Sequence, residues 1–326
     1  MSHDVDPSAF PVRCLRVRDV DLAFVHAGLG GTPLLLLHGW PETKRIWWRN
    51  IGGLLTAGFE VIAPDLRGFG DSDPAPDGAY DVAACSMDVA ALLAVLGHKR
   101  CVVCGGDFGG VVAQDLSLRS PGLVDRMLLF NTIPPFSFEA YEREGLAPFP
   151  VTELEHFQRH GLHADQLIEG LGTAEACGEY VASVYGTDGW VGQEPLDEPS
   201  VQFMAEPFAG TEALRRSLHL YSYAFGVPAS EPPRLFEPNP TPTIVLYGPE
   251  DPVVPPLFVD QMRLAFPNAI GPFVLPGVGH FVQWERSAVV NQMLAWLATE
   301  VRFGQGDPSD PTGVGLTRGF RARILE

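Results

Sequence analysis

The sequence contains few of the features that would place a protein in a membrane or on nucleic acid. Only two lysines occur among its 326 residues, Lys44 and Lys99, and the net charge is −18. Such a negative potential repels phosphate backbones and anionic lipids. No stretch approaches the ~20 consecutive apolar residues of a membrane span, and the N-terminus has no basic segment followed by an apolar one. We therefore expect a cytoplasmic protein without nucleic-acid or membrane partners that acts on a neutral small molecule.

Cysteine is also scarce, and its five copies are scattered along the chain. An odd, scattered set is not the paired framework of a disulfide-rich protein. The stretch "CVVC" at Cys101–Cys104 has the spacing of a redox pair, but residues three apart on a strand point to opposite faces. We interpret both side chains as buried apolar thiols.

Apolar runs and helical patterns alternate along much of the chain. The run "PLLLL" is stopped by Gly39 and Pro41, which is typical of a strand buried on both faces. From about Pro134 to Pro238, strand-like runs are few, and Pro- and Gly-rich connections separate helical patches. The alternation then returns and continues to about residue 303.

This order predicts an α/β protein with a mostly parallel central sheet flanked by helices. A helical cap is inserted after the sixth strand. We expect the core to comprise residues 1–134 and 239–305, the cap residues 135–238, and an irregular C-terminal tail residues 306–326.

A carboxylate lies at the apex of a glycine-rich turn between a predicted strand and helix. "GGDFG", Gly105–Gly109, fits the pattern of a strained elbow that presents a nucleophile, with Asp107 at its apex. Only small neighbours let the strand and helix approach closely enough for this turn. The elbow would present Asp107 at the carboxyl edge of the sheet, where open α/β folds bind ligands.

Three further segments follow predicted strands in an informative order. "HGWP" can supply the backbone N–H of Trp40 to an oxyanion hole, and the N–H of Phe108 would be the second donor. "YGPED" places Asp251 at the same edge of the sheet, and "GVGHF" places His280 there. The order of nucleophile, acid and histidine is that of an α/β-hydrolase.

The chain resembles the α/β-hydrolase superfamily over about residues 15–303, through "HGWPE", "DLRGFGDSD", "GGDFGG", "YGPEDPVVP" and "GVGHFVQWE". Within it, the aspartate at the elbow, "HGWP" and the cap resemble epoxide hydrolases most, and haloalkane dehalogenases more loosely. The loop "DLRGFGDSD" is interpreted as a structural loop beside the oxyanion segment.

An aspartate nucleophile changes the task of the histidine. A carboxylate is ionised at neutral pH and can attack saturated carbon directly, which gives an alkyl ester of Asp107. His280, oriented by Asp251, can then activate water to hydrolyse that ester. The expected reaction is hydrolysis of an apolar neutral epoxide to a vicinal diol.

The resemblance to epoxide hydrolases further implies two proton donors on the cap. "LRRSLHLYSY" matches one donor region and nominates Tyr221, with Tyr223 as the nearby substitute. The other region, "FPVTELEHFQRHG", contains no tyrosine; Glu153 is near the expected position, and we nominate His156, one turn later. We expect Trp40, Phe108 and Tyr221 to contact the substrate.

Two alternative functions remain open. The same ester could serve a haloalkane dehalogenase, although the Phe108 ring offers no indole N–H to a halide. Neither Phe108 nor Val111, one turn later, can hold a substrate carboxylate as an arginine does, so a charged small acid is not expected. A ligand-binding relative without turnover is the second alternative.

We expect no cofactor and no metal. His156, His160 and His163 have helical spacing, but no distant cysteine or histidine cluster accompanies them, and Gly161 is expected to end the helix. The sequence is compatible with a monomer or a homodimer.

Overall fold

A computed structural model describes residues 6–186 and 189–303, and the predicted tail at 306–326 lies outside them. The described chain contains one eight-stranded sheet. No described helix combines the length and apolarity that a bilayer crossing requires. The strands are β1 (Val12–Val17), β2 (Val20–Ala27), β3 (Thr32–Leu37), β4 (Phe59–Pro64), β5 (Cys101–Gly106), β6 (Val124–Phe130), β7 (Thr243–Tyr247) and β8 (Ala269–Val274).

The strand order is β1-β2-β4-β3-β5-β6-β7-β8. β2 pairs antiparallel with β1 and β4, and every other neighbouring pair is parallel. The predicted mostly parallel sheet is therefore confirmed. Because the parallel strands run in one direction, the loops that follow them meet at one edge, as the elbow hypothesis requires.

The central strands are buried along nearly their whole length. Every residue of β4, β5 and β7 is buried, as continuous apolar strands between two helical layers should be. Helix α2 packs on α3, and α1 packs on α12. The core helices are α1 (Trp48–Thr56), α2 (Val82–Val95), α3 (Asp107–Arg119), α10 (Phe258–Ala265), α11 (Val282–Glu285) and α12 (Ser287–Phe303), with 3-10 turns η1 (Pro7–Ala9) and η2 (Lys44–Trp47).

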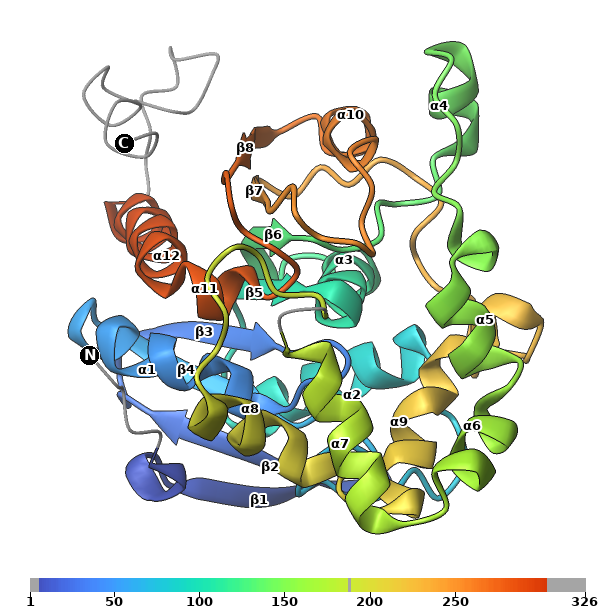
Figure 1. The fold of residues 1–326 in the computed structure, drawn as a ribbon. Coiled ribbons are helices and arrows are strands. Elements are labelled where there is room, and N and C mark those ends of the chain that lie inside the picture. Colours follow the sequence, from blue (N-terminus) through green and yellow to red (C-terminus); the bar gives the residue numbers. More distant parts are fainter. Residues whose placement is uncertain (1–5, 187–188, 304–326) are drawn as a thin grey trace.

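A helical insertion connects β6 to β7, which confirms the insertion after the sixth strand. Figure 1 shows α5 (Glu155–Gly161), α6 (Ala164–Leu171), α7 (Ala174–Val184) and α9 (Thr211–Ser222) on the side toward which the β3 arrow points, with α4 (Phe138–Arg143) projecting away from the rest. The segment "VTELEHFQRHG" has the pattern of one helix, but the structure divides it into η3 and α5, because Leu154 between them has an extended backbone. The insertion contains α4 (Phe138–Arg143), η3 (Val151–Glu153), α5 (Glu155–Gly161), α6 (Ala164–Leu171), α7 (Ala174–Val184), α8 (Glu198–Ala205), η4 (Glu206–Phe208), α9 (Thr211–Ser222) and η5 (Tyr223–Phe225).

Specific hydrogen bonds attach the insertion to the loop that follows β3. The indole N–H of Trp40 donates to Oγ of Ser217 on α9 at 3.0 Å. The Tyr185 hydroxyl, just after α7, donates to the carbonyl of Pro41 at 2.5 Å. All four groups are buried, so these bonds fix the insertion over this loop.

The loop "DLRGFGDSD" has a structural task next to this segment. Asp65 is fully buried and accepts from both the backbone N–H and the ammonium of Lys44, at 2.7 and 2.6 Å. Asp71 accepts from the same ammonium, but its side chain is 65% exposed. Asp65 therefore anchors the start of η2, four residues beyond Trp40.

We expect Asp65→Ala to lower the free energy of unfolding by about 3–5 kcal/mol, because it leaves the Lys44 ammonium buried without its buried partner. Asp71→Ala is the matched control and should cost about 0–1 kcal/mol, as an exposed ion pair does. Urea denaturation of both variants measures the difference. Equal losses would show that burial of the pair is not what matters.

Candidate active site

The elbow places Asp107 at the end of β5 and the start of α3 in a strained conformation. Asp107 has a backbone φ of +45°, a conformation that residues other than glycine rarely adopt. A Cβ on Gly109 would lie 2.4 Å from the carbonyl oxygen of Leu37, so only glycine allows β3 and α3 to approach this closely. The strain presents the Asp107 carboxylate at the carboxyl edge of the sheet.

Backbone N–H groups and a histidine hold the Asp107 carboxylate in its charged form. Oδ1 accepts from the backbone N–H of Trp40 at 2.8 Å. Burial raises the pKa of Asp107, but His280 and the N–H groups of Phe108 and Trp40 outweigh burial and lower it below its ordinary value. The two N–H groups that the sequence nominated therefore both stabilise negative charge on this side chain.

His280 lies between two carboxylates. Its Nδ1 donates to Oδ2 of Asp251 at 2.8 Å, and its Nε2 lies 3.5 Å from Oδ2 of Asp107. Burial lowers the pKa of His280, but Asp251 and Asp107 outweigh it and raise that pKa well above the ordinary value. Without substrate, the structure therefore favours an imidazolium paired with Asp107.

Asp251 is itself fixed by neighbouring donors. Oδ2 also accepts from the Asn131 side-chain amide at 2.9 Å, and Oδ1 accepts from the backbone N–H of Val253 at 2.7 Å. Asp251 follows β7 and His280 follows β8, so the three predicted residues meet at one edge of the sheet. Sequence order alone did not reveal the contribution of Asn131, which follows β6.

An apolar cavity of about 580 Å³ opens beside the Asp107 carboxylate. Most of its lining is hydrophobic, which suits a neutral apolar ligand. Residues from the core, from η3, and from α9 and η5 meet around it. Those that the sequence had singled out are Asp107, Phe108, Val111, Glu153, Tyr221 and Tyr223.

Tyr221 provides a protonated hydroxyl at this cavity. It is 2% exposed, and its hydroxyl makes no hydrogen bond to another described residue. Burial and the negative charge of Asp107 raise its pKa well above the ordinary value. The hydroxyl of Tyr223, in contrast, accepts from the backbone N–H of Tyr80 at 2.9 Å. Tyr221 is therefore the better placed of the two tyrosines.

The structure separates the two residues nominated from the other region of the cap. The His156 ring packs edge-on against Tyr221, with ring centroids 6.0 Å apart, but His156 does not line the cavity. Burial lowers its pKa to about 4, so it is a neutral N–H donor at neutral pH. Glu153 lines the cavity but is exposed to solvent.

The side chain of Trp40 lies behind the cavity rather than in it. Its indole is fully buried against the His160 ring, with centroids 4.4 Å apart, and does not line the cavity. Nε2 of His160 and the Tyr180 hydroxyl form a hydrogen bond of 2.7 Å. No pattern in the sequence links residues 40, 160 and 180, so this support could not be predicted from it.

Another buried carboxyl group near the site, in addition to Asp107 and Asp251, belongs to Glu42. It accepts from the backbone N–H of Gly39 at 2.5 Å and from the amide of Gln283 at 2.6 Å. Burial raises the pKa of Glu42 to about 7, and the negative charge of Asp107 adds to this rise. The sequence offered only its position after "HGWP" as a signal.

Glu42 should make stability depend on pH. Between pH 4.5 and about 7, folded Glu42 keeps a proton that the unfolded chain has released, so the free energy of unfolding falls as pH rises. The fall should reach about 3 kcal/mol. In Glu42→Gln it should disappear, since the Gln283 amide can turn its unpaired Oε1 toward the new amide. Parallel pH profiles for the two proteins, measured by urea denaturation, would contradict this.

Comparisons with known proteins agree with this architecture. The chain matches the model of the alpha/beta hydrolase fold family over residues 32–287. It is 42% identical to the soluble epoxide hydrolase of Corynebacterium sp. strain C12 over 113 residues, which is 34% of this chain and 38% of that protein. It is 26% identical to epoxide hydrolase A of Mycobacterium tuberculosis over 319 residues, covering 86% of this chain and 95% of that protein.

A solved structure of the epoxide hydrolase CorEH without ligand is similar to 90% of this chain and 100% of its own, with a TM-score of 0.76 and 24% identity. At that identity, the likeness establishes the fold. The family match covers more than half of the sequence and includes the elbow, Asp251 and His280. The chain belongs to the alpha/beta hydrolase fold family.

Proposed function

We propose that the protein hydrolyses an apolar, neutral epoxide to a vicinal diol through an ester of Asp107. The observation that carries this proposal is an ionised Asp107 that faces an apolar cavity together with the Tyr221 hydroxyl. A carboxylate at the elbow suits attack on saturated carbon, and the hydroxyl suits an oxygen leaving group. The names of the relatives in Corynebacterium and Mycobacterium support the same substrate class.

In the first step, an oxygen of Asp107 attacks an epoxide carbon and the ring C–O bond breaks. The released alkoxide takes the proton of Tyr221, whose high pKa makes it a hydrogen-bond donor rather than a strong acid. The proton of the His280 imidazolium restores the phenol. The neutral His156 ring packs against Tyr221 but does not line the cavity, so ring opening is proposed to depend on Tyr221.

Ester formation itself prepares His280 for the second step. The ester has no charge, so one of the two carboxylates that keep His280 protonated is lost. Neutral His280, held by Asp251, then takes a proton from water while the hydroxide attacks the ester carbonyl carbon. The Trp40 and Phe108 N–H groups stabilise the oxyanion. On collapse, the ester C–O bond breaks, the leaving oxygen takes the proton of the added hydroxyl, and the diol leaves with the Asp107 carboxylate and protonated His280 restored.

Residues 135–238 are proposed to act as a cap that closes the cavity, over a core formed by 1–134 and 239–305. The cavity lining supports this division, since Tyr221 comes from the insertion and Asp107 from the core.

Loss of the Tyr221 hydroxyl should slow ring opening strongly. We expect Tyr221→Phe to lower kcat/KM for an epoxide by roughly 10²–10³-fold, within the range of general-acid contributions. Tyr223→Phe is the matched control and should lose less than about tenfold, because its hydroxyl is bound to Tyr80. Steady-state kinetics on both variants measure this; similar losses would remove Tyr221 from its proposed role.

A panel of neutral epoxides and of bromo- and chloroalkanes tests the function directly. Diol should form from epoxides without halide release from the alkanes. In a single turnover in water labelled with heavy oxygen, the label should enter Asp107 rather than the diol, because water attacks the ester carbonyl. Halide release without diol would replace the proposal by dehalogenation, and no product from either class would favour a non-catalytic binding protein.

A further inference from the structure

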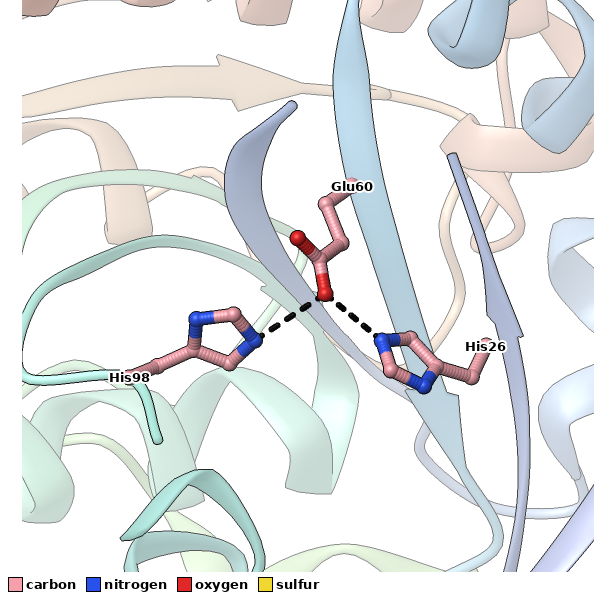
Figure 2. A group of neighbouring side chains, drawn as sticks. All are labelled: His26, Glu60 and His98. Atoms are coloured by element: carbon pink, nitrogen blue, oxygen red, sulfur yellow. Dashed lines mark hydrogen bonds and ion pairs between the residues drawn. The ribbon is translucent and has the colours of Figure 1, made fainter. Parts of the chain in front are cut away.

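Two histidines and a glutamate from separate parts of the chain converge far from the cavity. His26 lies on β2, Glu60 on β4, and His98 in the turn between α2 and β5. Figure 2 shows both rings directing a nitrogen at the same Glu60 oxygen. Their ligand atoms all lie within 4.8 Å of one another, and no other such group occurs among the described residues.

The cluster is largely shielded from water. The side chains of His26, Glu60 and His98 are 5%, 8% and 14% exposed. Nε2 of His26 lies 2.7 Å from Oε1 of Glu60, and Nε2 of His98 lies 3.1 Å from it. Oε2 of Glu60 accepts from the backbone N–H of Gly30 at 3.0 Å, which orients the carboxylate.

Strand pairing and a helix end fix the backbone that carries these side chains. His26 pairs with Ile62 across β2 and β4, so Glu60, two residues before Ile62, points to the same face of the sheet. Gly97 adopts φ = +85° at the end of α2, and the N–H of His98 bonds to the carbonyl of Leu93. This helix end holds His98 toward the strands.

We propose that His26, Glu60 and His98 form a binding site for a first-row divalent cation such as Zn²⁺. Two imidazoles and one carboxylate are a donor set that such cations prefer, with a coordination position left for water. Ligand atoms around one tetrahedral Zn²⁺ lie ~3.4 Å apart, given bonds of about 2.1 Å. The observed separations of 2.7 and 3.1 Å need only small side-chain rotations to reach this.

The neighbouring Arg13 gives this site a distinctive signature. Arg13 donates to Nδ1 of His26, so without metal the proton of His26 is on Nε2. A metal on Nε2 would move that proton to Nδ1, where it would face the guanidinium. Arg13 is exposed and can rotate away, but its contact competes with the metal.

The proposed cation would act on stability rather than on catalysis. Glu60 is the second residue of β4 and His98 precedes β5, so the cluster lies at the amino edge of these parallel strands, opposite Asp107 at the carboxyl end of β5. A six-residue strand spans ~20 Å. A cation here would tie β2 and β4 to the end of α2, and it would stabilise the folded state by mass action.

Zinc titration of the untagged, chelator-treated full chain tests the site. We expect one equivalent of Zn²⁺ by calorimetry, a rise in Tm, and no change in activity. His98→Ala and Glu60→Gln should each weaken binding by more than ~100-fold, since even supporting residues around a metal contribute ~10–100-fold. His163→Ala, which removes an exposed histidine elsewhere, should bind as the parent protein does.

Arg13→Ala should bind zinc more tightly than the parent protein. The test therefore does not rest only on a loss of binding, which a misfolded variant would also show. Binding at least several-fold tighter than in the parent protein supports Nε2 of His26 as a ligand atom. No zinc bound by the parent protein would overturn the proposal and leave a hydrogen-bonded cluster. If His98→Ala and Glu60→Gln bind zinc as tightly as the parent protein does, the proposal is also overturned, because the zinc then lies elsewhere.

Discussion

After incubation with a reactive epoxide, the variant His280→Gln is expected to accumulate a covalent ester on Asp107. Glutamine can still donate a hydrogen bond to Asp251, but it cannot accept the proton of the attacking water. Asp107 loses the pKa-lowering effect of His280 but keeps the N–H groups of Trp40 and Phe108, which also favour the carboxylate. Ester formation should therefore continue in this variant, whereas ester hydrolysis should fail. Turnover should fall by roughly 10²–10⁴-fold, as expected for loss of a general base.

Intact-mass measurement checks this result, because the mass should rise by that of one epoxide. Peptide mapping should place the addition on Asp107. The double variant with Asp107→Asn is the control and should remain unmodified. If no adduct forms across reactive epoxides and haloalkanes, neither enzymatic reaction through Asp107 can be correct.

The second large effect is expected from Asp107→Asn. This variant should lower the turnover rate by at least ~10⁴-fold, since no ester can form. Its fold should be retained. Asparagine tolerates positive φ better than most residues, and its amide oxygen can accept from the Trp40 N–H. Asp107→Ala should be equally inactive but less stable by about 1–2 kcal/mol, because alanine gains nothing from the left-handed conformation.

The same variant tests how His280 is prepared for water activation. Without the Asp107 charge, the pKa of His280 should fall, since that carboxylate is one of the two that raise it. The ring protons of His280, followed by NMR during a pH titration, report this directly. An unchanged pKa in Asp107→Asn would contradict the proposed link between ester formation and the proton of His280.

Local patterns predicted the sheet, the insertion and the residues at the strand ends well. "GGDFG" specifies a strained turn, and the loops after parallel strands necessarily meet at one edge, so Asp107, Asp251 and His280 could be nominated together. The structure brings these three together, although their catalytic roles stay predictions. The interruption at Leu154 was not visible in the periodicity, since the residues around it suit a helix equally well.

What the sequence could not predict depends on contacts between distant segments. The burial of Glu42 results from packing around the loop after β3, and no local pattern reports it. His26 and His98 are 34 and 38 residues from Glu60, their shared partner, so the sequence shows no ligand spacing. The expectation of no metal rests on the spacing of histidines along a helix. Such spacing does not report donors that meet across a sheet.

Trp40 belongs to two parts of the molecule at once. Its backbone N–H holds Asp107, while its indole holds Ser217 on α9 of the insertion. A displacement of α9 that strains the second bond also strains the residue that makes the first. We therefore expect the position of α9 and the charge state of Asp107 to be thermodynamically coupled, so that a ligand that changes one also changes the other.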